Sequence, residues 1–227
     1  MEKIKKINTK VKEVWYYYIK QYNITTEVKP HKQTIDGVQK EVEGGTISKQ
    51  FKIDENGKEV EDIYEVVDNR ADSKKEIKMV PEDGYRIKSV TINDEEIFID
   101  NMVAEDKSLV LPAAYFKDVQ KDYHIVVEYE RIPAKVIVQY IDEFTKESIR
   151  LDKVIDGFVH DEYNETRPEI DSYIAVNPEP ENSQGKMVEG VITIVYYYEK
   201  QYRITTDVIE HLEDKNNLVD VIVDKTD

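Results

Sequence analysis

The chain has 227 residues, enough for one large domain or two small ones, and it is rich in Val, Ile and Tyr, which favour β-strands. Its formal net charge of −16 would repel a phosphate backbone or an anionic membrane surface, so we expect no nucleic-acid partner. It has no cysteine, which removes thiol nucleophiles and Cys-based metal sites, and no apolar stretch approaches the length of a membrane span, so we expect no membrane insertion.

The first residues, 1–12, are basic but lack the apolar segment of a signal peptide, so we expect any signal or anchor to lie outside this sequence. A phrase with three consecutive tyrosines follows at 14–28 and returns at 194–208, a constant offset of 180 residues. Of the 18 residues from 14 to 31, 11 are identical to their counterparts 180 positions later. Self-similarity at a fixed period predicts a tandem array of modules rather than a single active site.

Strand and turn patterns fill the next hundred residues. Gly44-Gly45 predicts a turn or bulge, and Glu55-Asn56-Gly57 and Asp83-Gly84 predict tight turns between strand-like runs. Residues 125–130 alternate as a strand, and Pro133 is expected to end that strand and to mark a joint between domains.

The last third of the chain contains the two most apolar strand patterns. Residues 136–141 and 191–198 are β-branched or aromatic on both alternating faces, which is typical of strands that are covered on both sides. The best helix signal is 161–170, where the polar residues 162–165 could form a short helical turn that Pro168 limits. We therefore predict a mainly β protein of tandem small domains, with at most one short helix in each.

The repeat also predicts where the units begin and end. Residues 1–20 would be the closing strand of a truncated unit, and 21–132 would be one complete domain. Residues 133–201 would be a second, shorter domain, and 202–227 the truncated start of the next unit of the first kind.

Residues 133–201 carry a series of short phrases in the order and spacing of a known family. They are Val136, Val138 and Tyr140 before Asp142-Glu143; Gly157 and Tyr163; Ile170 and Tyr173; Pro180, Asn182 and Gly185; and Val191 to Tyr198. On these residues the segment resembles the MucBP (mucin-binding protein) repeat of Gram-positive surface proteins.

Residues 21–132 resemble a divergent internalin-type B-repeat. The phrases that carry this resemblance are Gly44 to Ile47; Gly84, Tyr85, Ile87, Val90, Ile92 and Asn93; and Phe116, Val119, Asp122, Ile125, Val127, Tyr129 and Glu130. Both resemblances imply small β-grasp-like domains with mostly antiparallel sheets.

The sequence contains no pattern that predicts catalysis, a cofactor or a metal site. No nucleophile elbow, P-loop or dinucleotide fingerprint is present. None of the four histidines, His31, His124, His160 and His211, has another histidine at ligand spacing, and His31 and His211 occupy one repeat position. Acidic loops such as 54–56 leave a structural calcium ion as an alternative, and Lys135 is a conceivable donor for an isopeptide crosslink.

The 16 tyrosines are the remaining candidates for recognition. On a strand, Tyr17 and Tyr197 point away from the tyrosines on either side of them. One of the two sides must be core, and we take Tyr17 and Tyr197 as the candidate ligand-binding residues on the other. Two interpretations stay open: these rings form an exposed aromatic surface that stacks on sugars, or they pack against a loop or a neighbouring domain.

Together these patterns predict a repeat region of an extracellular bacterial adhesin on the cell surface or cell wall. It would act as a stalk and as a weak multivalent binder, and the MucBP resemblance implies host glycans or mucin-type glycoproteins as partners, beside neighbouring repeats. The alternatives are a non-catalytic accessory module of a larger surface enzyme and a self-associating surface module.

Overall fold

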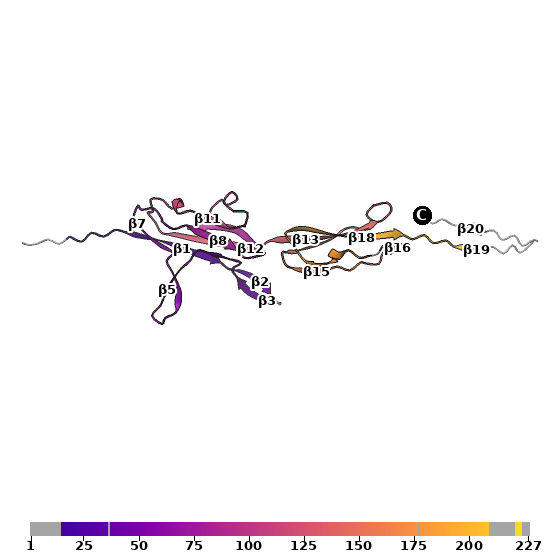
Figure 1. Cartoon of the computed structure of the whole chain (residues 1–227), viewed down its shortest axis with the longest axis horizontal. Helices are drawn as coiled ribbons and strands as arrows, with labels where there is room; N and C mark the ends of the chain where they lie inside the picture. The colour runs from indigo at the N-terminus through magenta and orange to yellow at the C-terminus, as the bar shows by residue number, and fades with distance from the viewer. Residues whose placement is uncertain (1–14, 36, 177, 209–220, 224–227) are drawn as a thin grey trace, which may run out of the picture. The chain divides into compact units, whose positions relative to one another are not determined.

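The computed structural model describes residues 15–35, 37–176, 178–208 and 221–223, and this described part is built from strands with two short 3-10 turns and no α-helix. The mainly β class predicted from the sequence is confirmed. The chain divides into two compact units, Met1–Glu130 (unit 1) and Arg131–Asp227 (unit 2), each with its own sheets (Figure 1).

Unit 1 is organised around a five-stranded sheet of order β10-β9-β12-β1-β7. Its central pair, β1 and β12, runs parallel, with Ile24 beside Tyr123 and Lys29 beside Glu128, while the outer pairs are antiparallel. A three-stranded sheet of order β11-β8-β4 packs on it. The strands of unit 1 are β1 (Gln21–Lys29), β2 (His31–Ile35), β3 (Val38–Val42), β4 (Gly45–Ile47), β5 (Gln50–Ile53), β6 (Glu59–Asp62), β7 (Glu65–Asp68), β8 (Ile77–Pro81), β9 (Tyr85–Ile92), β10 (Glu95–Glu96), β11 (Leu109–Leu111) and β12 (Tyr123–Arg131), with the 3-10 turn η1 (Ala113–Tyr115).

The glycine pair at 44–45 is required by two aromatic rings of the unit 1 core. Gly44 has a φ of +75°, and a Cβ there would lie 2.6 Å from the Tyr85 ring. A Cβ on Gly45 would lie 2.6 Å from the ring of Tyr129, whose hydroxyl donates to the Thr46 carbonyl oxygen. Only glycine lets the backbone approach the rings this closely, so the glycine pair that predicted a turn or bulge is required by packing.

Two hairpins extend from the sheets of unit 1, β2–β3 and β5–β6 (Figure 1). The turn of the β5–β6 hairpin is the one predicted at 55–57: the Gly57 amide donates to the Asp54 carbonyl over 3.0 Å, and Gly57 has a φ of +78°. The turn predicted at 83–84 joins β8 to β9, which belong to different sheets, so it is a tight turn but not a hairpin.

Unit 2 contains a four-stranded sheet of order β14-β13-β18-β16 and a small β15–β17 ribbon. Its central pair, β13 and β18, is again parallel, from Ala134 beside Gly190 to Asp142 beside Tyr198, and its outer pairs are antiparallel. The 191–198 and 136–141 patterns thus become the two central strands. The strands of unit 2 are β13 (Pro133–Asp142), β14 (Lys153–Phe158), β15 (Glu162–Asn164), β16 (Tyr173–Ala175), β17 (Gln184–Lys186), β18 (Gly190–Lys200), β19 (Thr206–Val208) and β20 (Val221–Val223), with the 3-10 turn η2 (Glu181–Ser183).

The helical turn predicted at 162–165 is wrong, because this segment begins with strand β15. Tyr163 lies beside Gly185 of β17 in an antiparallel pair, and the Glu165 amide donates to the Ser183 carbonyl over 2.8 Å. The partner strand supplies the backbone hydrogen bonds that a short helix would otherwise have to make within itself, and so overrides the weak local preference.

The division at 1–20, 21–132, 133–201 and 202–227 stays a prediction. The unit boundary falls between Glu130 and Arg131, just before Pro133. Large parts of the two predicted truncated units, residues 1–14, 209–220 and 224–227, lie outside the described residues.

Candidate functional site

Strand β18 presents its three tyrosines to opposite sides of the sheet. Tyr196 and Tyr198 are buried, and their hydroxyls donate to the carbonyls of Glu165 (3.0 Å) and Pro168 (2.8 Å). Tyr197 lies on the other side, beside Ile141 of β13, and 39 % of its surface is exposed. The predicted alternation is therefore confirmed in this copy, and Tyr197 is a half-exposed aromatic ring.

A tightly hydrogen-bonded loop after β13 lies next to Tyr197. The buried Asp142 carboxylate accepts from the backbone amides of Phe144 (2.9 Å) and Thr145 (2.8 Å), and these hydrogen bonds, the one from Thr145 first, lower its pKa. Phe144 is 93 % exposed at the tip of this loop, and the Lys146 ammonium lies 5.2 Å from the centre of the Tyr197 ring. A ring, an ammonium and an exposed phenyl group therefore gather at this end of the sheet.

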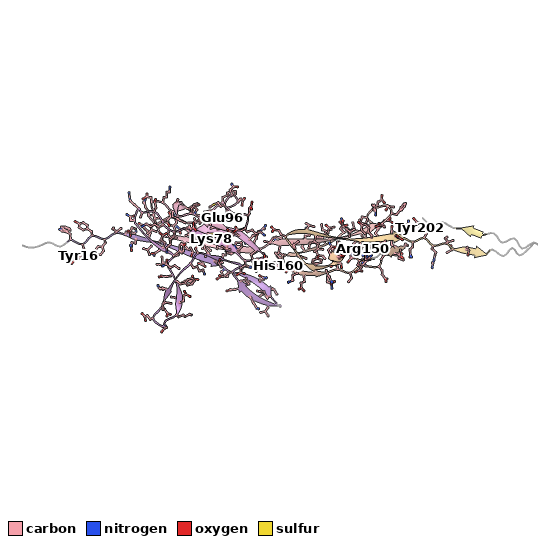
Figure 2. All side chains as sticks on the ribbon, viewed as in Figure 1. Tyr16, Lys78, Glu96, Arg150, His160 and Tyr202 are labelled. Carbon is pink, nitrogen blue, oxygen red and sulfur yellow. The ribbon has the colours of Figure 1, made fainter. Side chains whose placement is uncertain are left out.

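The first copy of the phrase has a different environment. Tyr17 is 89 % exposed in a stretch, residues 15–20, that forms no strand, and the Tyr16 ring likewise stands away from the packed strands (Figure 2). In the first copy only the second half of the phrase forms a strand, β1. In the second copy the first half does: 195–198 are in β18, whereas 201–205 form no strand. Tyr17 belongs to unit 1 and Tyr197 to unit 2, and the role predicted for either ring stays a prediction.

The other candidate residues are in ordinary structural contacts. His31 packs 5.8 Å from the Tyr85 ring, with no hydrogen-bond partner for its ring nitrogens in the described chain. His124 lies 3.2 Å from a Glu27 carboxylate oxygen, whereas His211 is outside the described residues. The Asp54 carboxylate accepts from the amides of its own turn. Within the described part of the chain, no group of three or more His, Asp or Glu side chains could hold a metal ion.

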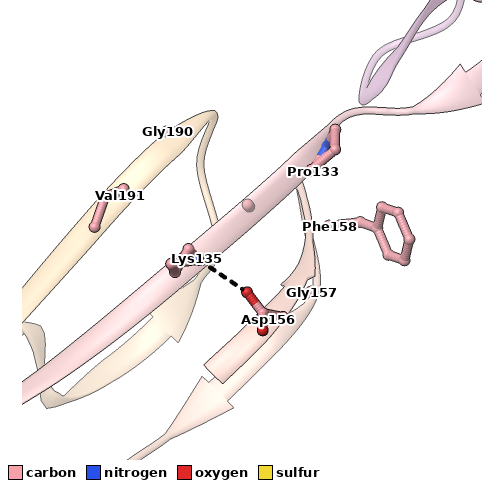
Figure 3. Close-up of a pocket in the computed structure, with 8 residues that line it drawn as sticks. Pro133, Lys135, Asp156, Gly157, Phe158, Gly190 and Val191 are labelled. Carbon is pink, nitrogen blue, oxygen red and sulfur yellow. Dashed lines mark ion pairs between the residues drawn. The ribbon is translucent and has the colours of Figure 1, made fainter. Parts of the chain in front are cut away.

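An open hollow of about 620 Å³, which no sequence pattern predicted, lies at the opposite end of the β13–β18 pair from Tyr197 (Figure 3). Its polar centre is the ion pair between Lys135 Nζ and Asp156 Oδ1, 3.3 Å apart, with Phe158 at one edge and Val191 at another. Lys135 is thus paired with an exposed carboxylate of β14. The apolar residues on both sides of β13 are the sequence feature that could have predicted an open surface at this strand.

One segment of the chain matches a known family. Residues 135–199 match the family model of the MucBP domain, which confirms the resemblance predicted for the segment that forms β13 to β18. No curated protein matches the chain. The resemblance of 21–132 to B-repeats stays a prediction.

MucBP domains form a family of binding repeats in extracellular surface proteins of Gram-positive bacteria, and this family is not a catalytic one. No helix in the described parts of the chain has both the length and the apolar character needed to cross a membrane.

Proposed function

We propose that the chain is a repeat region of a bacterial cell-surface adhesin, which serves as a stalk and as a weak multivalent binder of host glycoprotein or mucin glycans. The observation that carries this proposal is the MucBP match over 135–199, supported by the 180-residue repeat. Copies of a weak site on one chain raise the overall affinity without any new contact, which gives repetition a purpose beyond length.

Tyr197 is the residue through which the glycan is bound in this proposal. A half-exposed phenol ring offers an apolar face to the C–H groups of a sugar ring and a hydroxyl to its polar groups. The neighbouring Lys146 ammonium adds a hydrogen-bond donor for hydroxyl or carboxylate groups. Tyr17 is its repeat counterpart and would act in the same way where the preceding strands are present.

The experiment is binding of the full chain to immobilised mucin and to a glycan array. Tyr197→Ala should weaken binding roughly fivefold, because one aromatic contact contributes on the order of 1 kcal/mol. Tyr115→Ala is the matched control, since Tyr115 is similarly exposed (46 %) but belongs to unit 1. Equal binding by the parent chain and Tyr197→Ala would contradict the role of Tyr197, and no binding by the parent would leave only the stalk.

A further inference from the structure

In the main sheet of each unit, the strand that comes first in the chain and the strand that comes last are direct neighbours and run in the same direction. In unit 1 these strands are β1 and β12, and six residues of β1, from Ile24 to Lys29, lie beside β12. In unit 2 they are β13 and β18, and nine residues of β13, from Ala134 to Asp142, lie beside β18. We call β1–β12 and β13–β18 the terminal pairs.

The parallel direction of a terminal pair decides how tension along the chain acts on it. A pull on the start of the first strand and on the end of the last strand slides the two strands past each other. The hydrogen bonds of a parallel pair are evenly spaced along the strands, so they resist this sliding together. In an antiparallel hairpin such as β2–β3, a pull on its two ends reaches the hydrogen bonds one after another. The terminal pairs are therefore loaded in the direction in which a ladder is strongest.

The terminal pair of unit 2 lies in the middle of its sheet. β13 is flanked by β14 and β18, and β18 is flanked by β13 and β16, so neither strand can peel away from an open edge. The side chains of Val136, Val138 and Ile194 on the core side are fully buried. The rings of Tyr140 and Tyr196 stack across the pair with their centres 6.2 Å apart. Packing thus holds the two strands in register.

In unit 1, polar side chains link the two strands of the terminal pair. Lys29 Nζ of β1 lies 2.9 Å from Glu128 Oε2 of β12. Thr25 Oγ1 of β1 lies 2.9 Å from His124 Nδ1 of β12. These contacts add to the backbone ladder, and β7 and β9 flank the pair on its two sides.

The other strands of each main sheet lie between the two strands of its terminal pair along the chain. Strands β2 to β11 connect β1 to β12, and β14 to β17 connect β13 to β18. Tension that passes directly across the terminal pair does not reach these connecting segments while the pair is intact. Their loops and short strands can therefore remain folded under load.

We propose that the terminal pairs are mechanical clamps, which keep both units folded while the chain bears tension. Load bearing rests on the stalk part of the proposed function and is independent of glycan binding. Resistance to forced unfolding depends on the rate of unfolding rather than on the free energy of unfolding. A small unit of modest equilibrium stability can therefore carry load if its clamp breaks slowly.

The test is single-molecule force spectroscopy of the full chain, with unit 2 pulled in two directions. Because the chain has no cysteine, introduced thiols provide unique attachment points. The Pro133→Cys/Gln201→Cys variant is pulled at opposite ends of the terminal pair, which loads it in shear. The Phe144→Cys/Gln201→Cys variant is the matched control, because both of its thiols lie at the same end and the pull opens the pair stepwise. The shear variant should unfold at a force at least about twofold higher.

Two truncations, each made in the Pro133→Cys/Gln201→Cys variant, locate the resistance. Val138→Ala removes a fully buried side chain of β13 and should lower the unfolding force. Met187→Ala removes a buried side chain between β17 and β18, outside the terminal pair. It should lower the free energy of unfolding but leave the unfolding force unchanged, because contacts that break only after the clamp do not affect the unfolding rate.

Equal unfolding forces for the two attachment pairs would overturn the proposal. A loss of force in Met187→Ala as large as that in Val138→Ala would also overturn it. No glycan is present in these measurements, so their outcome is separate from that of the mucin-binding experiment. A unit that unfolds at equal force in both directions but still binds mucin would remove the load-bearing role alone.

Discussion

Tyr196, Tyr197 and Tyr198 are neighbours in the sequence but lie in two environments. The two even-numbered rings are in the core, where each hydroxyl has a backbone carbonyl as acceptor, so their burial leaves no phenol group unsatisfied. Tyr197 faces outward, beside the Lys146 ammonium. Strand alternation alone places two of the three rings in the core and leaves the third half-exposed.

The buried Tyr198 predicts a loss of stability at alkaline pH. Burial raises its pKa from the ordinary value of 10 to about 12. Between these values the unfolded chain releases the phenolic proton that the folded chain keeps, so the free energy of unfolding falls as pH rises through this window. Urea unfolding below and within the window should show the decline, and Tyr198→Phe should make it shallower. An equal decline in both chains would refute this assignment.

At the scale of the element, β18 is the central strand on which unit 2 depends. It pairs in parallel with β13 over most of its length and antiparallel with β16 at its end. One side of the strand fills the core, and the other, with Val191, Val195 and Tyr197, faces away from it. The two sides should therefore contribute differently to the free energy of unfolding of a single chain.

Truncation of two neighbouring side chains on β18 should separate the two contributions to the free energy of unfolding. Ile194→Ala removes a fully buried side chain and should lower the free energy of unfolding of unit 2 by about 2–5 kcal/mol. Val195→Ala, one position later on the opposite side of the strand, should lower it by less than about 1.5 kcal/mol, because that side chain is only partly buried. Amide exchange resolved by strand is the measurement, in dilute solution, with β1 and β12 unchanged in both variants. Equal effects would show that the side of β18 that carries Val195 is packed within a single chain.

At the scale of the whole molecule, each unit has its own hydrophobic core. The first strand of unit 1 begins at Gln21 and the long strand of unit 2 ends at Lys200, so the main sheets lie within one 180-residue period. The repeated tyrosine phrase spans the point where one period passes into the next. In the second copy, the first half of the phrase lies in β18 and pairs with β13. In the first copy, the second half lies in β1 and pairs with β12 and β7.

Because its core is separate, unit 2 should fold without unit 1. A fragment covering 131–208 should give amide cross-peaks for β13 to β18 that overlay those of the full chain. We expect changes to be confined to residues next to the cut. A fragment with the narrow amide dispersion of an unfolded chain would show that the two units fold only together.

The sequence by itself determined the β class, the repeat, the turns at 55–57 and 83–84, and the two-sided character of β13 and β18. These follow from local physics: alternation, β-branching and the freedom of glycine are readable one residue at a time. The tertiary structure alone decided that β13 and β18 pair in parallel, that 162–164 forms a strand, and that Tyr17 and Tyr197 differ in surroundings. Each of these depends on which distant segment supplies the backbone hydrogen bonds, and no local pattern specifies a partner. For the same reason the sequence indicated that both faces of the central strands need a cover, and only the structure revealed which face unit 2 leaves open.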